Sequence, residues 1–177
     1  SPAGAAGPWQ IMKGTALDHG LEVNSEIDER YHMVKATVVA CEYLNKAHDK
    51  FNNWTLAAAS YNMGMGGTAK ILAEQRVNSY YELRLNSETG RYVYRMAALK
   101  HIHEHLDDYG YIYHKSEGYS LPVFDTITVN SSVPNWVDWS IDHNTTYKAL
   151  RLYNPWLRAS KLSNNSNNTY QILVAKE

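Results

Sequence analysis

Apolar residues recur at helical spacing through most of the first 108 residues, and short breaks rich in Gly, Asn and Ser separate the apolar runs. Such breaks are typical helix ends, because Gly adopts the left-handed backbone after a last turn and Asn accepts hydrogen bonds from a first turn. The spacing and the breaks predict helices over residues 9–19, 33–51, 54–63, 67–72 and 89–109.

Two of these helices carry an apolar stripe that we expect to face the core. The earlier stripe includes Cys41, which is therefore expected to be a packed core thiol. The stripes consist of Met33, Thr37, Ala40, Cys41, Leu44, Ala47 and Phe51 in one helix, and of Tyr92, Met96, Leu99, Ile102 and Leu106 in the other.

The pattern changes after a Tyr-, Gly- and Ser-rich stretch that ends at Pro122. Beyond it, the sequence predicts a strand at 123–129, helices at 134–143 and 145–153, and a strand at 170–174. We therefore expect a mainly α protein with a small C-terminal βααβ module. The expected division is a helical domain over residues 1–110, a linker over 111–122 and the module over 123–177.

Composition narrows the class of protein. The chain has 177 residues, 44% of them apolar, and a formal net charge of −1, so it can bury a core but has no excess of basic residues for nucleic-acid binding. A single cysteine excludes an intrachain disulfide. No run approaches the roughly 18 apolar residues that a membrane span needs.

The aromatic residues are mostly amphipathic, with 14 Tyr and 5 Trp against 2 Phe. Tyr and Trp combine an apolar ring with a polar group, which suits a sugar ring with its apolar faces and hydroxyl edges. A Tyr-rich surface and core boundary is an equally good interpretation of this composition.

The first ten residues are a candidate binding loop, because they are rich in small residues and glycine and end in Gln10. Glycine lets a ligand or another chain segment approach the backbone closely, and an amide side chain suits a polar polymer such as a glycan. Taken alone, Trp9 is better explained as a core residue.

Three motifs, taken together and in this order, resemble the lytic murein transglycosylases, which have a goose-lysozyme-like fold. They are the glycine-rich loop at residues 1–10, Ala-Ser-Tyr-Asn-Met-Gly at 59–64 and Glu-Thr-Gly-Arg-Tyr-Val at 88–93. Residues 28–30 and 80–85 resemble the membrane-bound D-type branch. The resemblance covers the chain to about residue 108.

The resemblance implies a non-hydrolytic reaction on peptidoglycan. The family cleaves the β-1,4 bond between N-acetylmuramic acid and N-acetylglucosamine and leaves a 1,6-anhydro end, with one glutamic acid serving as acid and then as base. By the family pattern this glutamate lies upstream of Ser1. We therefore expect no catalytic acid within this chain, and little or no turnover by residues 1–177 alone.

The resemblance also assigns candidate site residues. Ser1 and Tyr92 match positions that support the acid, and Gln10, Tyr61 and Asn62 match positions that bind the glycan. No cofactor is implied.

The C-terminal module resembles a degenerate LysM domain, which is a peptidoglycan-binding βααβ unit. Its characteristic residues are found at 139–141, 145–150 and 152–155, whereas Val-Pro-Asn at 133–135 replaces the usual Gly-Asp. A glycan-binding unit and a structural spacer both remain open for this module.

A group of histidines, His101, His103 and His105, invites a metal-site interpretation, since His101 and His105 share a helix face. A catalytic zinc site needs a third ligand and an open position, and no His-Glu-x-x-His order is present. We interpret the cluster as a solvated helix face and expect no metal, with a metal hydrolase as an alternative.

These features predict an exported enzyme of the bacterial cell envelope, periplasmic or attached to the outer membrane, with membrane anchoring possible through a segment before Ser1. The expected partner is a peptidoglycan glycan strand, and no nucleic acid is expected. The alternatives are a lysozyme-type hydrolase of the same fold and a non-catalytic murein-binding protein.

Overall fold

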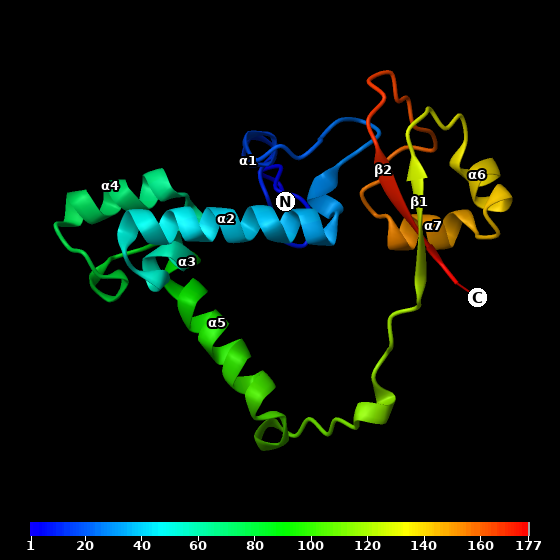
Figure 1. Ribbon diagram of the computed structural model, residues 1–177. Coiled ribbons are helices and arrows are strands. Elements are labelled where there is room, and N and C mark those ends of the chain that lie inside the picture. Colours follow the sequence, from blue (N-terminus) through cyan, green and yellow to red (C-terminus); the bar gives the residue numbers. More distant parts are fainter. Residues whose placement is uncertain (177) are drawn as a thin grey trace. The chain divides into compact units, whose positions relative to one another are not determined.

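The computed structural model describes residues 1–176, which form seven α-helices, several 3₁₀ turns and one two-stranded sheet (Figure 1). The expected mainly α fold with a C-terminal βααβ order is therefore confirmed. The helices and strands are α1 (Lys13–Asp18), α2 (Met33–Phe51), α3 (Trp54–Met63), α4 (Met65–Gln75), α5 (Thr89–Glu104), β1 (Phe124–Val129), α6 (Trp136–Asp142), α7 (Tyr147–Tyr153) and β2 (Tyr170–Ala175). The 3₁₀ turns are at Glu29–Tyr31, Tyr80–Glu82, Leu106–Tyr109 and Lys115–Glu117.

The described residues form two compact units. The first joins residues 1–40 with the C-terminal residues from 120 onward, and the second consists of residues 41–119. The division expected from the sequence, a helical domain over 1–110, a linker over 111–122 and a module over 123–177, stays a prediction. No helix among residues 1–176 has both the length and the apolar character of a membrane span.

The first helix is shorter than the sequence pattern predicts. We expected it to begin at Trp9, but α1 begins at Lys13, so that prediction is wrong. The backbone of Gln10 is left-handed, with φ at +50°, and Ile11 pairs with Ala6 in an antiparallel bridge. The chain folds back here because this pairing satisfies backbone groups that a helix would otherwise use.

Helix α2 has the predicted bounds, but its buried face differs from the predicted stripe. Ala36, Val39, Ala40 and Ala47 are buried, at 3% exposure or less. Cys41 is exposed, so its expected core position is wrong. It follows Ala40 directly, and a step of one residue turns a side chain by about 100° around the helix axis, out of the buried face.

Helix α3 begins and ends as its sequence signals indicate, whereas α4, at Met65–Gln75, extends beyond the predicted 67–72 at both ends. The side chain of Asn53 accepts the backbone N–H of Leu56 at 3.0 Å and caps α3. Gly64, with φ at +84°, separates α3 from α4, and this left-handed geometry favours glycine.

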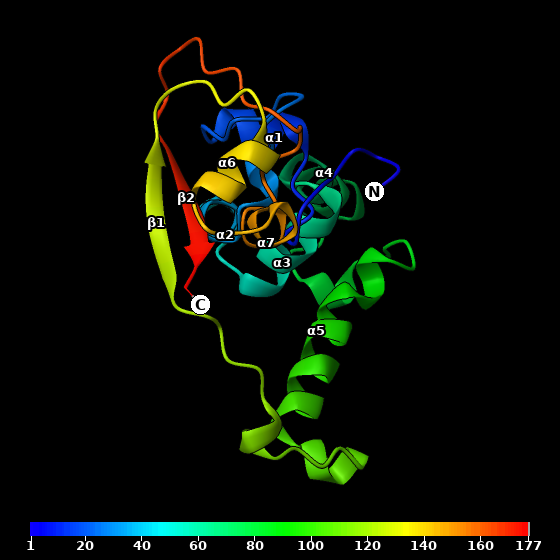
Figure 2. The same ribbon diagram turned by 90° about the vertical axis from the view of Figure 1, so that its right-hand side faces the viewer.

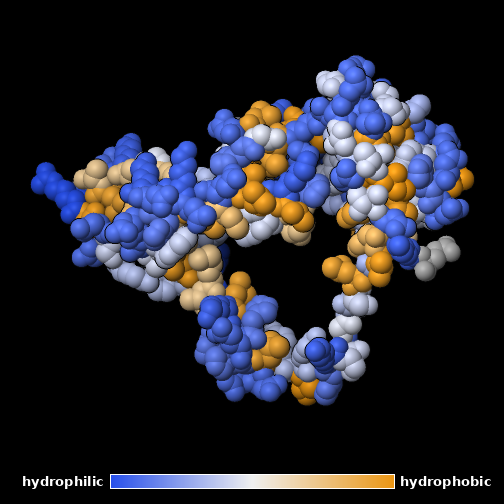
Figure 3. Space-filling model, viewed as in Figure 1, coloured by the Kyte–Doolittle hydropathy of each residue, from blue (hydrophilic) through white to orange (hydrophobic). Residues whose placement is uncertain are grey.

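Helix α5 begins at Thr89, where the side chain of Asn86 accepts the backbone N–H at 2.9 Å. Its first turn packs on α3, with Val93 against the cluster of Leu56, Ala59 and Tyr80. Further along, two residues of the predicted core stripe lie at the surface, Met96 at 44% and Leu99 at 57% exposure, so the stripe is wrong there. Apolar residues also reach the surface of the segment that follows the helix, where Ile112 is 80% exposed and Leu121 87% (Figure 3).

The C-terminal elements match the prediction closely. Strands β1 and β2 pair antiparallel, from Phe124 with Ala175 to Val129 with Tyr170, and α6 and α7 lie next to the sheet (Figure 2). A buried apolar cluster lies between these elements and holds Trp136, Leu150, Leu157 and Ile172.

Candidate functional site

The glycine-rich loop is a tight backbone structure. Ala6 and Ile11 exchange two backbone hydrogen bonds of 3.1 and 3.0 Å, and the N–H of Gln10 donates to the carbonyl of Gly7 at 3.1 Å. Gly4 and Gly7 both have positive φ, at +86° and +76°. The loop is therefore ordered by its own backbone before any ligand is considered.

Gly7 also lies against the backbone of residue 30. A Cβ added at Gly7 would lie 1.8 Å from the carbonyl oxygen of Arg30, whereas at Gly4 it would meet nothing within 4 Å. Gly7 is thus required both by its backbone angles and by close packing.

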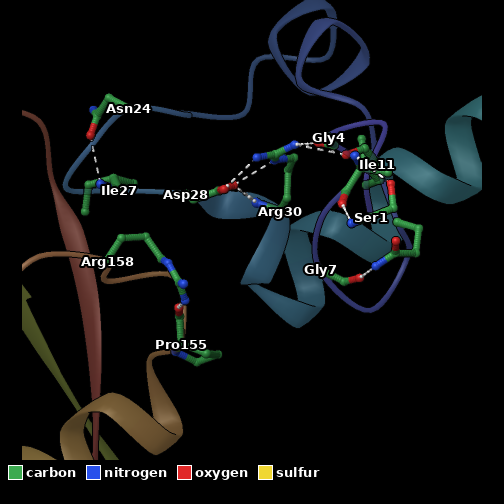
Figure 4. Close-up of polar contacts among 12 residues, drawn as sticks. Ser1, Gly4, Gly7, Ile11, Asn24, Ile27, Asp28, Arg30, Pro155 and Arg158 are labelled. Atoms are coloured by element: carbon green, nitrogen blue, oxygen red, sulfur yellow. Dashed lines mark hydrogen bonds and ion pairs between the residues drawn. The ribbon is translucent and has the colours of Figure 1, made fainter.

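The side chain of Arg30 fixes the loop from the same side (Figure 4). Its Nη1 donates to the carbonyl of Gly4 at 2.9 Å and to that of Ile11 at 3.2 Å. Its Nε and Nη2 donate to the two carboxylate oxygens of Asp28 at 2.9 and 2.8 Å. Arg30 and Asp28 are both buried, and the hydrogen bond to Asp28, offset in part by desolvation, raises the pKa of Arg30.

The sequence-predicted residues of this loop remain at the surface. The hydroxyl oxygen of Ser1 accepts the N–H of Ala5 at 3.2 Å, and the Nε2 of Gln10 donates to the carbonyl of Gly7 at 2.9 Å. Trp9 is half-buried and donates from Nε1 to the hydroxyl of Thr37 at 2.8 Å. Ser1 and Gln10 can therefore meet a ligand, whereas Trp9 holds the loop against α2.

The second unit brings together the other predicted residues. Tyr61 packs edge-on against Tyr43, with ring centroids 5.3 Å apart, and the Tyr92 hydroxyl lies close enough to influence its ionisation. Burial, followed by this neighbouring hydroxyl, raises the pKa of Tyr61 to about 12, and burial also raises the pKa of Tyr92. Both phenols are neutral hydrogen-bond donors at ordinary pH.

Asn62 ties the end of α3 to the start of α5. Its Oδ1 accepts the hydroxyl of Thr89 at 2.7 Å, and its Nδ2 lies 3.4 Å from a carboxylate oxygen of Glu88. Thr89 is 1% exposed. The second and third sequence motifs, 27 residues apart at Asn62 and Thr89, therefore meet through a direct side-chain contact.

The structure thus brings the predicted residues together as two groups. Ser1 and Gln10 share the glycine-rich loop of the first unit, and Tyr61, Asn62 and Tyr92 gather in the second. Sequence reasoning missed the contribution of Asp28 and Arg30, although residues 28–30 are part of the resemblance to the D-type branch. Tyr43, whose hydroxyl donates to the Ser60 carbonyl at 2.8 Å, carried no signal at all.

The histidines predicted as a solvated cluster lie at the C-terminal end of α5 and directly after it, in the second unit. The rings of His101 and His105 lie 4.3 Å apart, and the Nδ1 of His105 lies 2.9 Å from the carbonyl of His101. Within residues 1–176, no group of three or more His, Cys, Asp or Glu side chains is placed to hold a metal ion.

The C-terminal module contains an open hollow of about 310 Å³ beside the turn between β1 and α6. Polar side chains, including Asn135 and Asp138, line it together with Trp139. The Trp139 ring stacks on His143 at a centroid distance of 3.8 Å. An aromatic ring flanked by amide and carboxylate groups is a combination that can accommodate a sugar.

Comparison with known families gives these groups a context. Residues 1–83 match the family model described as the transglycosylase SLT domain, and residues 125–177 match the soluble lytic transglycosylase C-terminal LysM-like domain. The chain carries an SLT transglycosylase domain followed by a LysM-like domain. Ser1, Gln10, Tyr61 and Asn62 lie inside the matched SLT region, and Tyr92 lies after it.

Two curated relatives resemble this chain over part of its length. They are the membrane-bound lytic murein transglycosylase D of Escherichia coli strain K12 and the protein of the same name from Escherichia coli O6:H1 strain CFT073. Each is 33% identical over 115 residues, which covers 62% of this chain and 25% of the relative. The chain thus spans about a quarter of the length of these relatives.

Proposed function

We propose that this chain is the glycan-binding part of a peptidoglycan lytic transglycosylase. The observation that carries the proposal is the contact between the second and third motifs. Asn62 of α3 accepts the hydroxyl of Thr89 of α5. Tyr61 and Asn62 lie in the region that matches the SLT family model, and Thr89 and Tyr92 follow it. The two named relatives, which are murein transglycosylases, support the substrate class.

The proposed reaction cleaves the β-1,4 bond between N-acetylmuramic acid and N-acetylglucosamine. A glutamic acid donates its proton to the glycosidic oxygen as the bond from that oxygen to C1 of the muramic residue breaks. The carboxylate then takes the proton of the muramic 6-hydroxyl as O6 bonds to C1. No water is consumed, so one carboxyl group is enough, in contrast to the paired carboxylates of most glycosidases.

The residues of this chain bind the strand and support the acid. Gln10, Tyr61 and Asn62 contact the sugars, and Ser1 and Tyr92 lie near the acid and the reacting residue. Because burial raises their pKa values, Tyr61 and Tyr92 stay protonated at neutral pH and donate hydrogen bonds to carboxylate or sugar oxygens. The role of the acid itself is assigned to none of these five residues.

The proposed cellular location is the bacterial cell envelope. A murein substrate and the membrane-bound relatives favour the bacterial cell envelope, where the LysM-like domain adds a second contact with peptidoglycan. Its hollow beside Trp139 is the candidate surface for that contact.

The direct test digests purified murein sacculi with the full-length protein and identifies the products by mass spectrometry. We expect muropeptides ending in 1,6-anhydro-muramic acid, each lighter by one water than its hydrolysed counterpart. Tyr92→Phe should lower kcat roughly tenfold, the effect of losing one hydrogen bond in the transition state. Tyr119→Phe, at a fully exposed position, is the matched control and should leave kcat unchanged.

Other products would favour the alternatives. Reducing muramic ends without anhydro products would indicate a lysozyme-type hydrolase. Intact sacculi together with retained binding would indicate a non-catalytic murein-binding protein. Activity abolished by EDTA and restored by zinc would indicate a metal hydrolase.

A further inference from the structure

A segment of the SLT domain is built into the core of the LysM-like domain. Ile27 is 1% exposed and belongs to the apolar cluster of that domain, which includes Trp136, Leu150 and Ile172. It also pairs with Leu157 in an antiparallel bridge. A residue distant in sequence therefore fills a position that the LysM-like domain needs for its own core.

Backbone hydrogen bonds fix this segment on both sides of Ile27. The N–H of Asp28 donates to the carbonyl of Trp156 at 2.9 Å, and the N–H of Arg158 donates to the carbonyl of Glu26 at 2.7 Å. These bonds set the register of the segment, because backbone groups buried at such a junction need partners.

Side chains strengthen the same junction. The Glu26 carboxylate accepts both the N–H and the hydroxyl of Ser163, at 2.5 and 3.0 Å. The Tyr170 hydroxyl donates to Glu22 at 2.9 Å. The Arg158 guanidinium lies 4.2 Å above the ring of Tyr31, within the range of a cation–π contact.

The segment carries the loop-holding side chains immediately after this junction (Figure 4). Asp28 uses its N–H toward Trp156 of the LysM-like domain and its carboxylate toward Arg30. Arg30 in turn holds the carbonyls of Gly4 and Ile11. One short path of direct contacts thus leads from the LysM-like domain to the glycine-rich loop.

The guanidinium of Arg30 is suited to this task. Its planar fork grips the carboxylate with two donors and leaves a third nitrogen for the two loop carbonyls, a pattern that the ammonium of lysine cannot reproduce. Since Arg30 is only 8% exposed, each of these bonds offsets the cost of burying its charge.

We propose that the LysM-like domain acts as a positioning element for the glycine-rich loop, through Asp28 and Arg30. It holds the backbone of the loop in the shape that presents Ser1 and Gln10. The mechanical link is the path of contacts by which the LysM-like domain holds the loop backbone, and it does not depend on the proposed function. The link to catalysis does rest on the proposed function, in which this loop binds the glycan.

Hydrogen–deuterium exchange of the chain tests the mechanical link, because the amides of Ala6, Gln10 and Ile11 are all hydrogen-bonded in the loop. Ile27→Ala loosens the junction and should speed exchange of these amides by about tenfold or more. Glu26→Ala removes the side-chain contacts with Ser163 and the ion pair with Lys161 but leaves every core side chain in place, and it should speed exchange of the same loop amides by about threefold. Val174→Ala is the matched control, since Val174 is buried in β2 outside the shared cluster.

The proposal is overturned if Ile27→Ala or Glu26→Ala leaves the exchange of the loop amides unchanged, or if Val174→Ala speeds it as much. Exchange measured in Arg30→Lys is a second test of the mechanical link. This substitution should speed loop exchange while the amides of β1 and β2 keep their wild-type rates. Unchanged loop exchange in Arg30→Lys would remove Arg30 as the positioning residue.

Measuring the affinity for a soluble murein oligosaccharide shows whether a failed result counts against the positioning role or against the proposed function. In Arg30→Lys we expect the Kd to rise about tenfold, with Val174→Ala close to wild type. Faster loop exchange with an unchanged Kd would keep the mechanical link and contradict glycan binding by the loop. A raised Kd with unchanged loop exchange would contradict the positioning role.

Discussion

At the scale of single residues, Gly7 is the position of the glycine-rich loop at which we expect a substitution to be most destabilising. Its φ of +76° disfavours any residue with a Cβ, and the Arg30 carbonyl occupies the space that a Cβ would need. Gly4 shares the positive φ, at +86°, but faces open space. Substitution at Gly4 therefore tests backbone strain alone, whereas substitution at Gly7 tests strain together with steric overlap.

We expect Gly7→Ala to lower the free energy of unfolding by at least about 3 kcal/mol, because strain and overlap add. Gly4→Ala should lower it by about 1–2 kcal/mol, the strain of a left-handed alanine alone. Urea unfolding followed by tryptophan fluorescence measures both. Equal losses in the two variants would contradict the close packing of Gly7 on Arg30.

Tyr61 should give the folded protein a measurable dependence on alkaline pH. Its pKa of about 12 lies above the value near 10 of an unfolded tyrosine. Between those values the unfolded chain has lost a proton that the folded chain keeps, so the free energy of unfolding falls as the pH rises. Below about pH 10 this contribution is fully present.

Tyr61→Phe should make the alkaline fall in the urea midpoint shallower between about pH 10 and pH 12. Tyr119→Phe, fully exposed, is the control and should keep the wild-type slope. A wild-type slope in Tyr61→Phe would show that Tyr61 is not buried as the structure has it.

At the scale of elements, the contact of Asn62 with Thr89 joins α3 to α5. The same contact fixes the orientation of the Asn62 amide, which we propose binds the glycan. Loss of the Thr89 hydroxyl therefore affects both the helix pair and the amide.

Thr89→Val removes the hydroxyl and should lower the free energy of unfolding by about 1–2 kcal/mol, because it leaves the Asn62 oxygen without its donor. It should also weaken binding of a murein oligosaccharide several-fold. Thr89→Ser keeps the hydroxyl but loses a buried methyl group, at a similar cost of about 1 kcal/mol, and should bind like wild type. Equal affinity in both variants would contradict the role given to the Asn62 amide.

The sequence predicted the positions of the helices and strands well, but it predicted poorly which of their side chains are buried. Caps such as Asn53 and period changes after Pro122 are local signals, and the elements they predicted are present. Burial depends on what packs from elsewhere in the chain, so Cys41, Met96 and Leu99 were all misplaced in the core. A helical stripe predicts which residues share a face, but it does not show how far along the helix a partner extends.

At the scale of the whole molecule, long-range pairing is what the sequence could not supply. Ile27 lies in a stretch that looks like a polar loop, yet it fills the core of a domain about 100 residues further on. No periodicity marks such a residue, because its partners are not in its own segment. The site residues were found through motifs, whereas the contacts by which Arg30 holds the loop and Tyr43 packs on Tyr61 became visible only in three dimensions.

The central claim is that two groups of residues bind a murein glycan: Ser1 and Gln10 of the glycine-rich loop in the first unit, and Tyr61, Asn62 and Tyr92 in the second. A two-dimensional ¹H–¹⁵N NMR titration of residues 1–177 with a soluble murein oligosaccharide tests it most directly. We predict that the side-chain amides of Gln10 and Asn62 and the backbone amides of Tyr61 and Tyr92 shift as the oligosaccharide is added, while the side-chain amide of Asn53, which caps α3, does not. If the amides of either group keep their positions at saturating oligosaccharide, the account is contradicted for that group.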